Sequence, residues 1–169
     1  ALSNSIEIAD VNNDNVNDII LSGYDSTRFG IYLDVIGINT DGVITIISQS
    51  NFATFPDSIA QHVGGVGNID LADVNRDGYI DIYLNGSASS KVFLNNAGTF
   101  SVSNNWIPSI NLSYSAGKWG DVDSDGSLDL FIMGVNEYTN QIVNELYLNT
   151  GSTLEPDPST IFPSLINGS

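Results

Sequence analysis

One short loop pattern occurs three times in the sequence, and this repetition constrains the fold more than any other feature. The third copy, residues 121–129, places aspartate at positions one, three, five and nine and Gly126 at position six. A hard cation such as Ca²⁺ takes about six to eight oxygen ligands, and alternate side chains of a tight loop supply several of them. The pattern is the first half of an EF-hand loop, but position twelve is not glutamate and an apolar run follows at residues 130–132.

The other two copies start at Asp10 and Asp73, with asparagine as a neutral oxygen donor at position three. Position six is Asn15 or Gly78, residues that tolerate the left-handed turn that such a loop requires. The backbone carbonyl of position seven adds a ligand, and the aspartate at position nine closes the cage. We therefore predict three calcium sites, with these ligands: Asp10, Asn12, Asp14, Val16 and Asp18; Asp73, Asn75, Asp77, Tyr79 and Asp81; Asp121, Asp123, Asp125, Ser127 and Asp129.

The three predicted sites differ in charge. A single loop of this kind reads equally as a solvated acidic turn, but three copies with the same oxygen positions favour metal binding. The third loop carries four carboxylates where the others carry three, so we expect it to bind calcium most tightly. Arg76 lies within the second loop and should weaken the second site.

The composition is strongly acidic, with 4 basic and 20 acidic residues and a formal charge of −16. Half of the acidic residues lie in the three loops, and the remaining excess argues against nucleic-acid or anionic-membrane partners. The 41% of hydrophobic residues, regularly patterned, exclude a disordered acidic chain. There is no cysteine, no membrane-spanning run and no N-terminal leader pattern, so we expect a mature protein or an excised piece. Weak calcium loops suit millimolar calcium, which favours an extracellular or cell-surface setting.

Strands are expected on both sides of each loop, and no segment indicates a helix. A short strand precedes each loop, at residues 6–9, 69–72 and 118–120. A continuous apolar run follows it, at residues 19–21, 82–84 and 130–132, as in strands buried on both faces. Third strands are expected at 29–38, 91–94 and 145–148, each ending in a hairpin turn. Fourth strands are expected at 43–47 and 99–103, with a weak one after residue 152 because prolines interrupt it.

Four short strands per repeat, with a metal loop between the first two, are typical of β-propeller blades. The chain resembles the FG-GAP (VCBS) repeat family, best known from integrin α-subunits. The matching residues are the three aspartate loops and Trp119-Gly120, an aromatic–glycine pair, although Ala9 and Ala72 replace this glycine in the first two repeats. The resemblance implies an all-β, calcium-stabilised propeller that is commonly extracellular and adhesive or carbohydrate-binding. Fungal lectins and some polysaccharide-degrading enzymes are similar.

The predicted organisation is three blade-like repeats, at residues 1–60, 61–108 and 109–169, each a four-stranded antiparallel unit. Three blades do not close a propeller, which typically has about four to eight. Either two chains pair into a six-bladed ring, or further blades come from the same longer chain. We favour the second interpretation, a segment of a larger propeller.

The metal is expected to have a structural role, because an aspartate-rich hairpin cannot pack while its charges repel one another. A catalytic metal needs an open coordination position beside an acid or base, and no adjacent residue supplies one. The sequence contains no nucleophile elbow, zinc spacing or phosphate loop, and the only histidine, His62, lies in a polar connector. We therefore expect that the chain is not an enzyme.

Candidate ligand-binding residues lie in the loops at the end opposite the metal loops. Aromatic rings beside amide side chains suit sugar recognition, whereas the alternative is that the aromatic residues pack between blades. The leading hypothesis is a secreted or surface module that binds an extracellular protein or glycan. The alternatives are a non-catalytic domain of a polysaccharide-active enzyme and an architectural segment of an extracellular fibre. The candidate binding residues are Tyr24, Arg28, Trp106 and Tyr138.

Overall fold

The computed structural model describes residues 5–25, 30–38, 43–48, 68–86, 89–103, 105–106, 112–136 and 138–159. In this part the chain forms twelve strands and no helix, grouped in three four-stranded antiparallel sheets. The all-β prediction and the four-stranded antiparallel repeats are thereby confirmed. Within the described ranges, no helix is long and apolar enough to cross a membrane.

Each sheet is a simple meander, in which strands adjacent in the chain are hydrogen-bonded neighbours. The first sheet contains β1 (Ser5–Ala9), β2 (Asp18–Asp25), β3 (Gly30–Ile38) and β4 (Ile44–Ser48). The second contains β5 (Asn68–Ala72), β6 (Asp81–Gly86), β7 (Ser89–Asn96) and β8 (Thr99–Val102). The third contains β9 (Leu112–Gly120), β10 (Asp129–Asn136), β11 (Ile142–Asn149) and β12 (Leu154–Pro156).

The expected strands are present, but β2, β9 and β10 are longer than the runs expected from the sequence, and β9 differs most at its start. β9 begins at Leu112, well before the residue 118 expected from the sequence. Its first half pairs with β10 beyond an irregularity in register between Met133 and Val135. The small and polar residues of this half carry little strand signal, so pairing with β10 decides its conformation. The weak fourth strand of the third repeat exists as β12, which has three residues.

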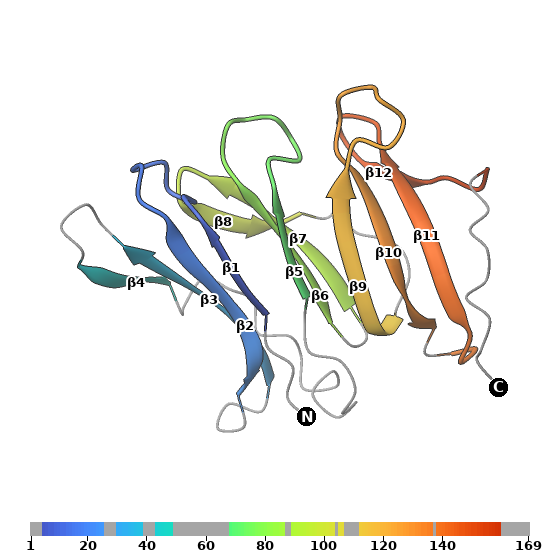
Figure 1. Ribbon diagram of the computed structural model, residues 1–169, viewed down its shortest axis with the longest axis horizontal. Coiled ribbons are helices and arrows are strands. Elements are labelled where there is room, and N and C mark those ends of the chain that lie inside the picture. The colour runs from blue at the N-terminus through green and yellow to red at the C-terminus, as the bar shows by residue number, and fades with distance from the viewer. Residues whose placement is uncertain are drawn as a thin grey trace.

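The three sheets stand side by side in chain order (Figure 1). β5 lies against both β1 and β9, so the first strand of each sheet faces the first strand of the next. The loops that join the first and second strands all lie along the upper edge in Figure 1. This arrangement is consistent with successive propeller blades, each sheet falling within one of the three predicted repeat ranges.

The core lies between the sheets. On β6, the side chains of Ile82, Tyr83 and Leu84 are all fully buried, as the apolar run predicted. Ile82 and Leu84 pack in a cluster with Val11 and Ile20 of the first repeat. Tyr83 points to the other face, where it joins a cluster with residues of the third sheet. The corresponding runs of β2 and β10 are buried on one face and half-buried on the other, because only the second sheet has a described neighbour on both sides.

Candidate metal centre

The three loops share one hydrogen-bonding scheme that starts at the aspartate in position one. In the first loop, the Asp10 carboxylate accepts from the backbone N–H groups of Asp14 (3.1 Å) and Asn15 (2.7 Å). In the second loop, the equivalent Asp73 accepts from positions five and six at 3.0 and 2.9 Å. In the third loop, Asp121 accepts from Gly126 at 3.1 Å. These bonds wrap each loop around its first carboxylate.

The side chains at positions three and five each cap the N–H group two residues ahead. Position three accepts from the N–H of position five in all three loops, at 2.9, 3.1 and 3.0 Å. Position five accepts from the N–H of position seven at 2.8, 2.9 and 2.6 Å. Such local bonds are typical of Asn and Asp turns. They hold alternate side chains on the inner side of the turn, where oxygen ligands of a cation belong. The residues are Asn12, Asn75 and Asp123 at position three and Asp14, Asp77 and Asp125 at position five.

Two positions in each loop adopt the left-handed backbone conformation. Position six does so with φ of 66° at Asn15, 91° at Gly78 and 86° at Gly126, as the sequence predicted. Position four does so as well, with φ values near 60° at Asn13, Arg76 and Ser124. The left-handed residue at position four was not predicted from the sequence. Arg and Ser have no left-handed preference, so only Asn13 could have indicated it.

The aspartate at position nine is buried in every loop and anchors the loop to its sheet. Its Oδ2 accepts from the N–H of the valine at position two, at 3.1, 3.0 and 2.9 Å. In the second and third repeats its Oδ1 also accepts an N–H from the end of the third strand, at 2.8 and 2.9 Å. These bonds fix the position of the carboxylate before any cation binds. The position-nine residues are Asp18, Asp81 and Asp129.

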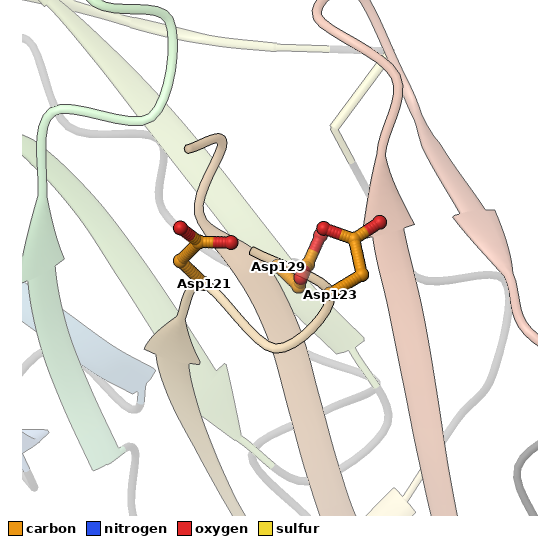
Figure 2. Close-up of side chains that lie close together, drawn as sticks. All are labelled: Asp121, Asp123 and Asp129. Atoms are coloured by element: carbon orange, nitrogen blue, oxygen red, sulfur yellow. The ribbon is translucent and has the colours of Figure 1, made fainter. Parts of the chain in front are cut away.

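In the third loop three carboxylates converge. One oxygen from each of Asp121, Asp123 and Asp129 lies within 4.8 Å of the others, and Figure 2 shows Asp121 and Asp123 on either side of Asp129. Among the residues that the structure describes, no other group of three acidic, histidine or cysteine side chains converges this closely. Three carboxylate oxygens fit a hard, oxygen-seeking cation such as Ca²⁺. The first two loops have the same frame, with an amide oxygen at position three.

The Arg76 side chain extends from the second loop to the third loop. Its Nη2 lies 3.3 Å from Ser127 Oγ, and the same nitrogen borders Gly126. The pKa of the Asp125 carboxyl is lowered chiefly by hydrogen bonds from Ser127 and also by the Arg76 charge. The prediction that Arg76 weakens the second site stays a prediction, and the contact with Ser127 places the same charge beside the third site as well.

Replacing Arg76 with glutamine should therefore raise the calcium affinity of the third site. Removing a positive charge beside a divalent ion in an exposed loop should tighten binding by about threefold to tenfold. Calorimetric titration measures the calcium affinity. The binding event that disappears in an Asp123→Ala variant is assigned to the third site. Lys91→Gln, which removes the same charge outside the loops, is the control. A rise in affinity at the second site alone would contradict this assignment.

Burial, aided by the charges of Asp77 and Asp73, raises the pKa of the Asp81 carboxyl from 3.8 to about 6. A carboxyl whose folded pKa exceeds its unfolded value stabilises the fold when protonated, so this contribution is full below pH 3.8 and is lost as the pH rises through about 6. In chelator, the unfolding free energy should fall by about 1–2 kcal/mol over this range because of Asp81. Urea titrations at several pH values measure it. Asp81→Asn should flatten the profile.

A buried asparagine at the end of the third strand joins neighbouring metal loops. The Asn95 side-chain amide donates to the carbonyl of Val11 (2.6 Å) in the first loop and to that of Ile80 (2.9 Å) in its own loop. In the third repeat, Asn149 makes the same two bonds, to Val74 and Leu128, both at 3.1 Å. Each of these asparagines therefore ties the position-two carbonyl of one loop to the position-eight carbonyl of the next.

Asn95→Ala should destabilise the protein by about 2 kcal/mol, because it leaves buried carbonyl groups without their donor. The adjacent Asn96 is exposed on the same strand, so Asn96→Ala is a matched control that should change stability little. Chemical denaturation of both variants in calcium measures the difference. Equal stability of the two variants would show that the bonds from Asn95 contribute nothing.

The predicted ligand-binding residues have different surroundings. Trp106 is 4% exposed and belongs to the core cluster between the second and third sheets, which fits packing between blades and not stacking on a ligand. Tyr138 is 83% exposed in the β10–β11 turn. Tyr24 lies at the end of β2, where only the backbone is described, and Arg28 and His62 lie outside the described residues.

One segment of the chain matches a known repeat family. Residues 73–132 match the family model of the FG-GAP-like repeat. The match begins at the first aspartate of the second loop and ends within β10, so it covers most of the second sheet and the third loop. No curated protein matches the chain significantly. FG-GAP repeats often bind calcium, in agreement with the carboxylate triad of the third loop. The chain therefore contains an FG-GAP-like repeat at residues 73–132.

Proposed function

We propose that this chain is a calcium-stabilised β-propeller segment that serves as an extracellular binding module for a protein or glycan. The observation that carries the proposal is the common hydrogen-bonding scheme of the three loops, with three carboxylates converging in the third. Each loop holds one cation, and the ligands are the side chains at positions one, three, five and nine and the carbonyl at position seven. Bound calcium neutralises the carboxylates at the upper edge of each sheet.

The metal has a structural role in this proposal, and the chain is not an enzyme. In the second and third repeats, the position-nine carboxylates accept backbone N–H groups on both the loop side and the strand side. This geometry supports a cation that holds the loop to the sheet. A weak site of this type is filled at the millimolar calcium concentrations found outside cells, which supports a secreted or cell-surface location.

Binding is assigned to the end of the sheets opposite the metal loops, where the β10–β11 turn presents Tyr138. The Asn136 side chain accepts from the N–H groups of Tyr138 (2.9 Å) and Thr139 (3.1 Å), and this turn is closed by an Asn136–Gln141 backbone bond of 2.8 Å. An exposed aromatic ring on a hydrogen-bonded turn loses little entropy on binding and can stack on the apolar face of a sugar.

A glycan array probed in calcium and in chelator tests the binding role. The expected result is calcium-dependent binding that Tyr138→Ala abolishes and Thr139→Ala, in the same exposed turn, preserves. Absence of glycan binding, together with capture of a defined extracellular protein, would assign the module to protein adhesion. Absence of both would favour the architectural alternative, a segment of an extracellular fibre. Cleavage of polysaccharide by this chain alone would overturn the proposal that it is not an enzyme. A catalytic domain attached to this chain would instead make the chain a non-catalytic accessory domain of that enzyme.

A further inference from the structure

Neighbouring metal loops contact one another through the side chain at position four. In the first loop this residue is Asn13, and its Nδ2 donates to the carbonyl of Gly78 in the second loop at 3.1 Å. In the second loop it is Arg76, whose Nη2 lies 3.3 Å from Ser127 Oγ in the third loop. Both position-four residues have the left-handed backbone conformation, so the same local geometry precedes both contacts. The contact between loops is therefore a repeated feature of the chain.

Each contact reaches the part of the next loop that holds a metal ligand. The carbonyl of Gly78 and the N–H of Tyr79 belong to one peptide group, and this N–H donates to Asp77 Oδ1 at 2.9 Å. In the third loop, the N–H of Ser127 donates to Asp125 Oδ1 at 2.6 Å. Asp77 and Asp125 are the position-five ligands of their sites. A side chain of one loop therefore contacts the residues that fix a ligand of the next.

A second bridge joins the same pairs of loops at buried residues. The amides of Asn95 and Asn149 each connect the position-two carbonyl of one loop to the position-eight carbonyl of the next. Position eight directly precedes the buried aspartate at position nine, which accepts the N–H of position two in its own loop. Each pair of neighbouring loops is therefore bridged twice, once at exposed residues and once at buried ones.

We infer that neighbouring sites bind calcium cooperatively and that Asn13 is a positioning residue for the second site; the inference rests on the proposed calcium role. A cation in the first loop restricts Asn13 and, through it, the peptide group that holds Asp77. The second cation then has less ordering to impose, so it binds more tightly. The charges act in the opposite direction, because the first cation lowers the negative potential at the second loop. Salt screens this repulsion but leaves the hydrogen bonds in place, so the cooperativity should rise as salt is added.

An NMR titration of the full chain with calcium follows each site separately. The position-six N–H of each loop donates to the position-one carboxylate, so its resonance reports the occupancy of that loop; the residues are Asn15, Gly78 and Gly126. Asp14→Asn retains an acceptor for the N–H of Val16 and removes a ligand charge from the first loop. It should weaken the second site by about fivefold, although every ligand of that site is intact. Asp77→Asn should weaken the first site by a similar factor, because coupling between two binding sites is reciprocal.

Asn13→Gly isolates the contact between the first two loops, because glycine accepts the φ of 59° and lacks the donating amide. The second site should weaken by about twofold to threefold, the effect of one exposed hydrogen bond. Ser124→Gly is the matched control, since Ser124 occupies position four of the last described loop with a φ of 65°. It should leave the second site unchanged, and equal weakening by both variants would contradict the role of Asn13.

The same titrations distinguish this inference from the calcium role on which it rests. A second site with one affinity in wild type, Asp14→Asn and Asn13→Gly would overturn the cooperativity and leave the calcium role intact. Position-six resonances that do not respond to millimolar calcium in any loop would overturn both proposals.

Discussion

Millimolar calcium should raise the melting temperature of this protein by roughly 10 °C or more relative to the same protein in chelator. Each site stabilises the fold by RT ln(1 + [Ca²⁺]/Kd), which is about 1.4 kcal/mol when calcium exceeds the dissociation constant tenfold. Three such sites together contribute about 4 kcal/mol. The hydrogen bonds within each loop make this stabilisation possible, because the ligand oxygens are already held by backbone N–H groups before the cation arrives.

A single-site variant separates calcium binding from general stability. Asp123→Ala should remove about a third of the calcium-dependent shift while leaving the melting temperature in chelator nearly unchanged, because Asp123 is exposed. Glu155→Ala removes the same charge from an exposed residue outside the loops and should leave both melting temperatures as they are. Differential scanning calorimetry in calcium and in chelator gives the four comparisons. An equal drop for Asp123→Ala under both conditions would mean that the third loop is not a metal site.

Gly117→Ala should destabilise the protein by about 3 kcal/mol or more, because a β-carbon there overpacks the core between the second and third sheets. That atom would lie 2.5 Å from Tyr83 Cε1 and 3.1 Å from the next ring carbon, Cζ. The Tyr83 ring is fully buried, its hydroxyl donates to Ser90 Oγ at 3.3 Å, and its edge meets Trp119 with ring centroids 6.0 Å apart. The ring therefore has no space into which it can withdraw.

Gly120 provides the matched control, because it lies on the same strand, β9, and a β-carbon added to it would meet nothing within 4 Å. Gly120→Ala should change the free energy of unfolding by less than about 0.5 kcal/mol. Urea denaturation in calcium measures both variants. Comparable stability of Gly117→Ala and wild type would show that the sheets can separate without cost, contrary to the packing described above.

The fold was predictable from the sequence where spacing alone carries the information. The aspartates recur at fixed offsets, and Gly78 and Gly126 stand where the loop must turn through positive φ, so each loop and its flanking strands could be placed. The second left-handed residue in each loop could not be placed, because Arg76 adopts this conformation through the hydrogen bonds of its neighbours and not through its own preference.

Contacts between repeats were beyond the sequence pattern. Nothing in the spacing indicates that Arg76 reaches the third loop, since the side chain could equally extend over its own. Asn95 and Asn149 read as ordinary hairpin-turn residues, yet their amides connect successive loops. For Trp106 the sequence left ligand binding and packing between blades as alternatives, and only the placement of the adjoining sheets shows that it is buried between them. Each of these features depends on how the sheets are placed against one another.

The bonds from Asn95 and Asn149 have a consequence for how such chains grow. Each asparagine recognises the preceding repeat through a backbone carbonyl, a group that every amino acid carries. A duplicated repeat therefore contains the donating asparagine, and the backbone carbonyl of the preceding loop can accept its hydrogen bond whatever residue stands there. Gene duplication can lengthen the array without a compensating change in its neighbours, and the repeats are then free to diverge on their outer loops.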